Sequence, residues 1–172
     1  MDVIIYSIPT ANGLIAMHGE KDYSFISESS WKSYLKTLKG AGVFIMGRRT
    51  YEVSLRTGAF PYPDCLNVVI THRKIKNKWG DKTLFTSKPP KQVVQMLKNK
   101  GFNKAIVTGG HLSASFMREK LVDEIWIDMM PRVFGKGTLL FDGAYFDADL
   151  KLLNVRRIKN EVQLRYKVIK YN

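Results

Sequence analysis

A short apolar run that stops at a glycine, followed at once by basic residues, constrains this chain most strongly. Residues 43–46 (VFIM) have the composition of a buried strand, and Gly47 separates them from Arg48, Arg49 and Thr50, which suit a helix N-terminus. The first turn of a helix has unpaired N–H groups and a partial positive charge, so it attracts anions. The arginines and the hydroxyl add donors at the same place. The pattern predicts a phosphate site, and a nucleotide cofactor is a common source of phosphate.

Elsewhere the chain alternates apolar stretches with helix-compatible ones. Extended segments are expected at residues 2–8, 13–17, 43–46, 66–71, 83–86, 104–108 and 123–130. A first helix should begin at Ser27 or Ser29 and end at Gly40. Its apolar stripe is formed by Trp31, Tyr34, Leu35 and Leu38. Further helices are expected after residues 47, 89 and 110. Strands that alternate with helices favour a largely parallel sheet.

The C-terminal part follows a different pattern. Val162, Leu164, Tyr166 and Val168 alternate with polar residues, which is typical of a half-buried strand. This strand should form a hairpin with residues 150–158. The expected fold class is therefore α/β, with a mostly parallel central sheet, flanking helices and a C-terminal antiparallel hairpin. A chain of 172 residues is expected to form one domain over residues 1–172.

Loops that suit anions follow several of the expected parallel strands. The carboxyl ends of parallel strands lie at one edge of a sheet, where ligands bind in open α/β folds. Glycines there let the backbone approach a pyrophosphate closely. We expect these loops to form one binding site, although each alone is also typical of a tight turn or a solvated basic face. Their residues are Gly47, Arg48, Arg49 and Thr50; Thr71, His72 and Arg73; and Thr108, Gly109, Gly110, His111, Leu112 and Ser113.

Positive charge is concentrated in the middle of the chain. The protein has 28 Lys and Arg against 15 Asp and Glu, a formal net charge of +13. Residues 61–120 hold twelve of the basic residues and three of the acidic ones. Such a field attracts a phosphorylated small ligand or a nucleic acid, and a solvated lysine-rich surface has the same composition. No expected strand face interleaves aromatic with basic residues, which disfavours a nucleic-acid partner.

Composition also disfavours other classes of protein. No apolar run reaches about eighteen residues, so no membrane span is expected. The first strand is not preceded by a basic region, so no secretory signal is expected. Cys65 is the single cysteine, which excludes an internal disulfide and fits a reducing cytoplasm. We see no His and Cys constellation of the zinc-binding kind, so no metal is expected.

Several segments resemble known reductases. Residues 43–52 (VFIMGRRTYE) resemble the cofactor-binding strand and helix of dihydrofolate reductases. Residues 109–125 and 131–141 resemble the reductase domain of the bifunctional deaminase–reductase of riboflavin biosynthesis, which has the same fold. Ser7 and residues 12–16 (NGLIA) look like that family's first loop, which borders nicotinamide and substrate. The resemblance implies a dihydrofolate reductase-like fold and an NADPH-dependent oxidoreductase that resembles 5-amino-6-(5-phosphoribosylamino)uracil reductase. The small-molecule substrate would be a heterocycle or a ribose phosphate.

The resemblance also implies roles for the loops. Residues 48–50 would hold phosphates of the cofactor, and residues 108–113 would hold its pyrophosphate. Residues 71–73 match the loop that receives the adenosine 2′-phosphate, with Arg73 as the ion-pair partner, which favours NADPH over NADH. In dihydrofolate reductases the glycine pair of the pyrophosphate loop carries a cis peptide bond. The alternative function is nucleotide binding without turnover, or RNA binding.

The catalytic residues are not identified by these patterns. Candidates are Asn12, Glu28 and Trp31, and weaker ones are Glu52, His18 and His111, which ordinary helix or loop positions also explain. Asn12 stands in a first loop that commonly reads Asp-Gly-Lys in riboflavin-pathway reductases. Trp31 occupies the position of the acidic residue that binds the pterin in dihydrofolate reductases. We therefore expect negligible dihydrofolate reduction, with Trp31 either lining the substrate side of the nicotinamide pocket or packing in the core.

A last expectation concerns assembly. Residues 123–141 contain apolar side chains that could be exposed, namely Trp126, Met129, Met130, Val133 and Phe134. The corresponding region of riboflavin-type reductases contributes to a dimer, and an exposed patch of this size is unusual on a monomer. The resemblance therefore implies a two-fold symmetric homodimer. The alternative is that this segment is a central strand and loop buried within one subunit.

Overall fold

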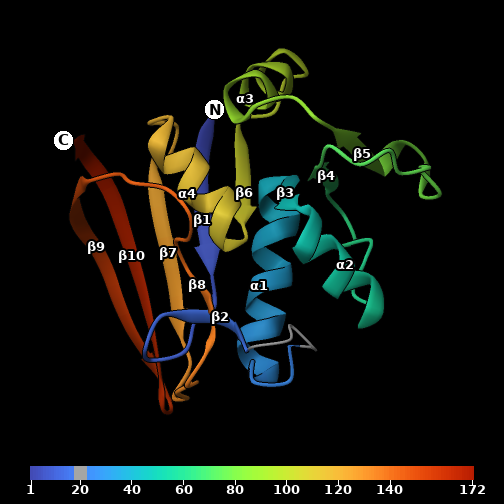
Figure 1. Cartoon of the computed structure of the whole chain (residues 1–172). Coiled ribbons are helices and arrows are strands. Elements are labelled where there is room, and N and C mark those ends of the chain that lie inside the picture. Colours follow the sequence, from blue (N-terminus) through green and yellow to red (C-terminus); the bar gives the residue numbers. More distant parts are fainter. Residues whose placement is uncertain (18–22) are drawn as a thin grey trace.

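A mostly parallel sheet organises the structure. The computed structural model describes residues 1–17 and 23–172. Within these residues the main sheet has eight strands in the order β5-β4-β3-β6-β1-β7-β10-β9 (Figure 1). The strands from β5 to β7 in this order are parallel, and β10 and β9 form an antiparallel hairpin at one edge. The predicted fold class is confirmed. The strands are β1 (Asp2–Ser7), β3 (Val43–Gly47), β4 (Leu66–Ile70), β5 (Thr83–Thr86), β6 (Lys104–Thr108), β7 (Glu124–Met129), β9 (Ala148–Ile158) and β10 (Glu161–Tyr171).

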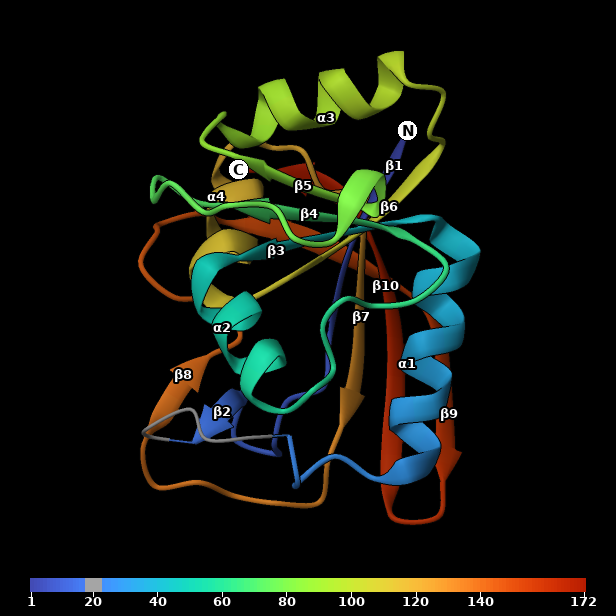
Figure 2. The same ribbon diagram turned by 90° about the vertical axis from the view of Figure 1, so that its right-hand side faces the viewer.

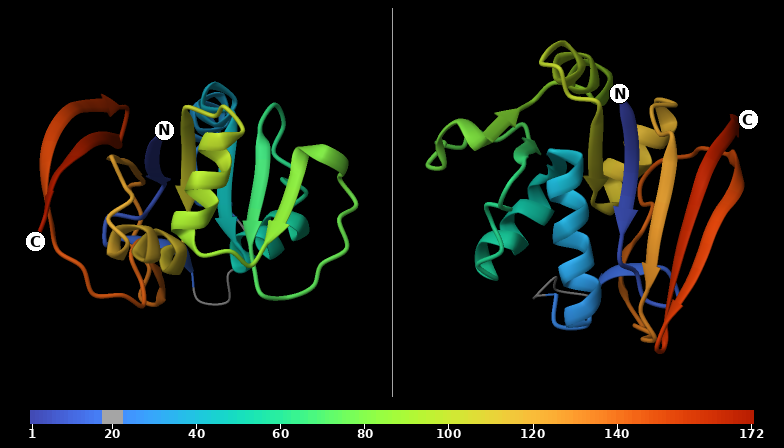
Figure 3. Two further views of the ribbon diagram at one scale, coloured as in Figure 1. Left: turned by 90° about the horizontal axis from the view of Figure 1, so that it is seen from above. Right: turned by 180° about the vertical axis from the view of Figure 1, so that it is seen from behind.

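Helices cover both faces of this sheet. They are α1 (Glu28–Ala41), α2 (Arg48–Arg56), α3 (Pro90–Asn99) and α4 (Gly110–Arg118), with a short 3₁₀ helix, η1 (Gly80–Lys82). α1 lies on one face, and α3 and α4 lie on the other (Figure 3). A separate antiparallel pair, β2 (Leu14–Met17) with β8 (Gly137–Leu139), lies apart from the main sheet (Figure 2). None of the helices in the described ranges is long and apolar enough to cross a bilayer.

Alternation along the strands creates a core on each face of the sheet. In β1, Ile4 and Tyr6 point into the core that also holds Leu38 of α1. Val3 and Ile5 point into the opposite core, beneath α3 and α4. Because successive side chains of a strand face opposite sides, a strand buried on both faces becomes an uninterrupted apolar run, as residues 43–46 are. The core positions therefore follow directly from the sequence pattern.

The ends of α1 show how local chemistry sets its boundaries. Ser27 caps the first turn, because its Oγ accepts a hydrogen bond from the Ser30 backbone N–H at 3.2 Å. The predicted end at Gly40 is wrong, since the helix continues through Ala41. Gly42 ends it in the left-handed conformation, with φ of 76°, and donates its N–H to the Leu38 carbonyl. Of two closely spaced glycines, the one that adopts positive φ is the terminator.

The β9–β10 hairpin forms as predicted, but its polar positions are not solvated throughout. Asp128 of β7 is fully buried, and its carboxylate accepts hydrogen bonds from Tyr6 Oη at 2.5 Å, Gln163 Nε2 at 2.9 Å and Arg165 Nη1 at 2.7 Å. Glu161 is also buried and accepts a hydrogen bond from Ser30 of α1. The polar face of β10 therefore packs against the protein interior, because this network supplies partners for its buried groups.

The expectation of an exposed apolar patch over residues 123–141 is largely wrong. Met130 and Phe134 are buried, with 1% and 5% of their surface exposed, and Trp126 packs against the α1-side core. Val133 is exposed. Sequence alone could not separate a strand covered by a loop from one covered by a second subunit. The alternative of a segment buried mostly within one subunit fits the structure better.

Candidate active site

The loops after β3 and β6 touch at the carboxyl edge of the sheet. β3 pairs in parallel with β4 on one side and β6 on the other, so the ends of these strands are adjacent. A Cβ atom on Gly109 would lie 2.9 Å from Thr50 Oγ1, and one on Gly47 would lie 3.9 Å from Leu112 Cβ. The predicted convergence of these loops is therefore observed.

A cavity of about 430 Å³ opens at this edge. Its size is in the range of small-molecule sites. Its walls come from the ends of β1, β3, β4 and β6, from β2 and β8, and from α1, α2 and α4. The predicted residues that line it are Gly47, Arg48, Arg49, Thr50, Thr108, Gly109, Gly110, His111 and Leu112. Ser113 is buried in α4 and does not line the cavity.

One end of the cavity is lined by two helix N-termini. α2 begins after Gly47 and α4 begins after Gly109, and neither N-cap residue makes a side-chain capping hydrogen bond. The first N–H groups of such helices lack intrahelical partners, so they favour an anion. Arg48 adds positive charge but is held by Glu52, whose carboxylate oxygens lie 2.7 and 2.9 Å from Arg48 Nη1. We call this part of the cavity the phosphate end.

The glycines of the β6–α4 loop have distinct structural roles. Gly109 has φ of 104°, which strongly favours glycine. A Cβ atom on Gly110 would lie 2.3 Å from the Leu139 carbonyl oxygen, so β8 can pack here only against a glycine. Within the described residues, the cis peptide bond is Phe60–Pro61, and the Gly109–Gly110 bond is trans. This loop thus departs from the cis glycine pair of dihydrofolate reductases.

The loop at residues 71–73 lies at the same edge but outside the cavity wall. Ile70 lines the cavity, whereas Thr71 is buried and accepts a hydrogen bond from the Arg73 N–H at 3.1 Å. His72 and Arg73 are exposed. β4 is adjacent to β3, so this loop follows the strand next to the phosphate end.

The opposite part of the cavity is lined by aromatic side chains, and we call it the aromatic end. Trp31 lies nearly parallel to Tyr23 and to Tyr34, with ring centroids 5.6 and 5.8 Å apart. Tyr62 lies 6.2 Å from Trp31. Tyr34 and Tyr62 each pack edge-on against Phe44. These rings come from α1, from β3 and from segments outside the helices and strands, which is why sequence motifs revealed none of them except Trp31.

Burial keeps the phenols of the aromatic end protonated. It raises the pKa of Tyr34 well above its ordinary value, and it raises the pKa of Tyr62 as well. Tyr62 Oη and Tyr23 Oη lie 2.9 and 3.2 Å from Ser54 Oγ, which itself donates to the Thr50 carbonyl. The hydroxyls of Tyr34 and Tyr62 at the aromatic end are therefore neutral.

Most of the other catalytic candidates lie away from the cavity wall. Asn12 connects its own loop to the loop that holds Phe134. Asn12 Nδ2 donates a hydrogen bond to the Phe134 carbonyl, and Asn12 Oδ1 accepts one from the Phe134 N–H. Glu28 is exposed and pairs with Lys32 on the surface of α1. Glu52 is engaged by Arg48, and His111 lines the phosphate end beside Asp142, at 3.4 Å. His18 lies outside the described residues.

Sequence motifs missed several lining residues, including Tyr23, Tyr62 and Thr138. Ser7, which the resemblance assigned to the first loop, ends β1 and lines the cavity. Tyr34 was visible only as part of an apolar helix stripe. Among the aromatic lining residues, only Trp31 was singled out from the sequence as a candidate for the site.

Comparison with known proteins settles the family. The family model of the RibD C-terminal domain matches residues 2–164. The chain belongs to the RibD C-terminal domain family. Among curated proteins, this RibD-type domain is 29% identical over 167 residues to YwjB, an uncharacterized protein of Bacillus subtilis strain 168, with 95% of each chain covered.

Solved structures share the fold of this RibD-type domain. A protein from Shewanella sp. PV-4, provisionally assigned to riboflavin biosynthesis, superposes with a TM-score of 0.83 and 20% identity, over 99% of this chain and 100% of that one. The diaminohydroxyphosphoribosylaminopyrimidine deaminase/5-amino-6-(5-phosphoribosylamino)uracil reductase of Thermotoga maritima gives a TM-score of 0.78 and 15% identity. The superposition covers 98% of this chain and 56% of the Thermotoga maritima protein. The fold is therefore dihydrofolate reductase-like.

Proposed function

We propose that this protein is an NADPH-dependent reductase that transfers a hydride to a small heterocyclic or ribose-phosphate substrate. Membership of the RibD C-terminal domain family and the fold support an oxidoreductase. The observation that carries the proposal is the single cavity onto which the N-termini of α2 and α4 both open. The reaction would resemble that of 5-amino-6-(5-phosphoribosylamino)uracil reductase, the activity named for the Thermotoga maritima protein.

The described residues fit a phosphate-bearing cofactor. The first turns of α2 and α4 and the side chains of Arg48, Arg49 and Thr50 offer donors to phosphates. Ser7 gives an independent indication, because it lines the cavity, is 3% exposed, and its Oγ finds no hydrogen-bond partner among the described residues. A buried hydroxyl without a partner costs about 1–3 kcal/mol. A ligand with a polar group at the end of β1 would relieve that cost.

The protein's part in the reaction is to bind, orient and exclude water. When bound, NADPH supplies a hydride from its nicotinamide ring. The phosphate end anchors one part of the ligand, and Ser7 and Thr108 border the space between this end and the aromatic rings. The apolar side chains of Ile8 and Ile26 limit water beside the reacting atoms. Fixed positioning of this kind accounts for much of the rate gained in hydride transfer.

Arg73 and its neighbours are proposed to select NADPH. The loop at residues 71–73 follows the strand next to the phosphate end, and His72 and Arg73 are exposed to an incoming anion. An arginine–phosphate pair is charge-assisted and can be bidentate. This loop would therefore hold the 2′-phosphate of the adenosine outside the cavity, while the rest of the cofactor enters it.

We also propose a homodimer, with its contact on the β9–β10 hairpin rather than on residues 123–141. The exposed apolar side chains Leu150, Leu152, Leu153 and Val155 of β9 and Ile169 of β10 are between 40% and 58% exposed. Exposed apolar side chains gathered on one hairpin favour association. Light scattering at micromolar concentration should give a dimer, and Val155→Lys should shift it to monomer. A monomeric wild-type protein would contradict this proposal.

The test of the proposed function is a comparison of cofactors. NADPH, NADH, FMN and FAD are titrated separately while the tryptophan fluorescence of the protein is followed. Saturable binding with NADPH tightest is expected. Tighter binding of a flavin, or no binding of any of the four, would contradict the proposal. NADPH binding without oxidation by any carbonyl compound would favour the alternative of a non-catalytic nucleotide-binding protein. A cytoplasmic location, where NADPH is available, belongs to the same proposal.

A further inference from the structure

The two ends of the cavity differ in charge. The lining residues with basic side chains, Arg48, Arg49 and His111, all belong to the phosphate end. The aromatic end is formed by Trp31 and by phenols, and no carboxylate lines the cavity among the described residues. A group that develops negative charge at the aromatic end would therefore have to be stabilised by a neutral donor.

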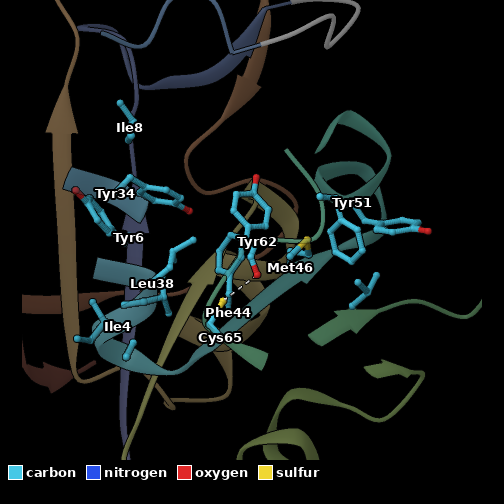
Figure 4. Packing of buried hydrophobic residues seen from close by; sticks show 14 of the residues in the cluster. Ile4, Tyr6, Ile8, Tyr34, Leu38, Phe44, Met46, Tyr51, Tyr62 and Cys65 are labelled. Carbon is cyan, nitrogen blue, oxygen red and sulfur yellow. Dashed lines mark hydrogen bonds between the residues drawn. The ribbon is translucent and has the colours of Figure 1, made fainter. Parts of the chain in front are cut away.

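Tyr34 is held rigidly at the aromatic end. It extends from α1 and packs on Tyr6 at a centroid distance of 4.7 Å and edge-on against Phe44 at 6.0 Å. The Tyr6 hydroxyl points the opposite way, toward Asp128 of β7, whereas the Tyr34 hydroxyl points toward Tyr62 and away from β7 (Figure 4). The ring is 5% exposed and lines the cavity. Its neighbours thus fix the direction in which its hydroxyl points.

The other phenols of the aromatic end have already committed their protons. Ser54 Oγ donates to the Thr50 carbonyl at 2.8 Å, so the single proton of this hydroxyl is used. Ser54 then accepts from Tyr62 at 2.9 Å, and Tyr23 donates either to Ser54 at 3.2 Å or to the Thr50 carbonyl at 3.5 Å. These two hydroxyls can offer only lone pairs to a ligand while this arrangement holds.

The proton of Tyr34 is not committed in the same way. The Tyr34 hydroxyl is not bonded to Ser54, and the nearby side chain of Thr108 lowers the pKa of Tyr34. Burial outweighs this effect and raises the pKa of Tyr34, so the phenol stays protonated. Because Tyr34 lines the cavity and, among the described residues, is not one of the phenols bonded to Ser54, its proton can be donated to a ligand.

We propose that Tyr34 is the hydrogen-bond and proton donor to the carbonyl oxygen of an uncharged, flat substrate bound at the aromatic end. The proposal rests on the proposed reductase function and specifies its substrate class and proton donor. As the hydride from NADPH forms the new C–H bond, the π electron pair of the carbonyl moves to oxygen. Tyr34 stabilises that oxygen and gives it a proton, and Tyr34 then takes up one proton (H⁺) from the solvent, so that the reaction consumes one proton. The products are an alcohol and NADP⁺.

The test uses 4-nitrophenolate, whose oxygen imitates the developing oxyanion and whose visible absorbance reports binding. A neutral buried donor should favour the anion, as donors aimed at developing charge do in other enzymes. Wild-type protein is expected to bind the phenolate, and Tyr34→Phe should weaken binding about 10- to 100-fold. Tyr51→Phe is the matched control, because Tyr51 is buried in the same core but does not line the cavity. It should change the affinity less than twofold.

Other variants keep the test decisive. Tyr62→Phe should weaken phenolate binding far less than Tyr34→Phe, and a larger loss would overturn the assignment of Tyr34. If Tyr34→Phe folds poorly, 3-fluorotyrosine at position 34, a stronger donor of the same shape, should tighten phenolate binding. An unchanged affinity in both Tyr34 variants, or no phenolate binding by the wild type, would also overturn it. NADPH titrations of the same proteins should be unchanged; failure of NADPH to bind the wild type would contradict the proposed function instead.

Discussion

The two ends of the cavity are built in different ways. The phosphate end consists of strand–glycine–helix segments, each continuous in sequence, such as residues 43–50 and 104–113. The aromatic end brings together Tyr23, Trp31, Phe44 and Tyr62, which are spread over forty positions of the chain. A site made of backbone N–H groups and glycines leaves a local pattern, whereas a site made of packed rings does not. The comparison suggests that cofactor binding and substrate binding can be changed separately.

The largest effect is expected from Gly110→Ala at the phosphate end. The added Cβ would lie 2.3 Å from the Leu139 carbonyl oxygen, so β8 or α4 must move. We expect a loss of unfolding free energy on the order of 3 kcal/mol and loss of NADPH binding. Thermal unfolding and a nucleotide titration measure both.

The matched control is Gly40→Ala, where an added Cβ meets no atom within 4 Å. Gly40 lies inside α1, so this change should raise the unfolding free energy by about 0.5–1 kcal/mol and leave NADPH affinity unchanged. If both variants bind NADPH normally, the packing of β8 against α4 does not shape the phosphate end.

A smaller effect is expected from Arg73→Ala, which tests whether the loop at residues 71–73 holds the 2′-phosphate of a cofactor bound at the phosphate end. Loss of a charge-assisted pair of about 1.5–3 kcal/mol should reduce the preference for NADPH over NADH tenfold or more. Affinity for NADH should change little, because it lacks the 2′-phosphate. Parallel titrations of both nucleotides measure the ratio. Equal losses of affinity for both nucleotides would show that Arg73 contributes only its positive charge and no contact with the 2′-phosphate.

Much of the fold and of the phosphate end could be predicted from the sequence, and the physical reasons differ from one region to another. The strand at residues 43–46 and the loops at residues 47–50 and 108–113 were predicted because glycine, arginine and apolar runs act locally. Gly40 was wrongly chosen as a helix end, because the identity of a residue does not reveal which glycine adopts positive φ.

Residues 123–141 and the aromatic end show what sequence could not supply. Met130 and Phe134 have the composition of an interface but are covered by their own subunit. Tyr34 has the spacing of a core residue but also lines the cavity. In both cases the outcome depends on which distant segment packs against the side chain, and periodicity contains no information about that partner.

Ser7→Ala should give changes of opposite sign in two measurements. Removal of a buried hydroxyl that lacks a partner among the described residues should raise the unfolding free energy of the ligand-free protein by about 1 kcal/mol. The same change should weaken NADPH binding several-fold, because the ligand loses a hydrogen bond. Chemical denaturation and fluorescence titration provide the values. A variant that is less stable and binds normally would remove Ser7 from the site.

The smallest effect is expected when dihydrofolate is added. The resemblance to dihydrofolate reductases aligns Trp31, which lines the cavity, with their pterin-binding carboxylate, and Glu28 is exposed beside Lys32. NADPH absorbance should therefore stay constant with dihydrofolate, and methotrexate should bind weakly. Trp31→Ala should alter ligand binding at the aromatic end; unchanged binding with a lowered melting temperature would make Trp31 a core residue. Robust oxidation of NADPH would show that the aromatic end accepts a pterin.

A crystal structure of the protein with NADPH tests the central claim most directly. The account predicts the pyrophosphate against the first turns of α2 and α4, the 2′-phosphate beside Arg73, and the nicotinamide between Ser7 and the aromatic end. The space beside Tyr34 should remain open for a substrate. Phosphates bound elsewhere, or a nicotinamide ring at the phosphate end with the adenosine among the aromatic rings, would contradict it.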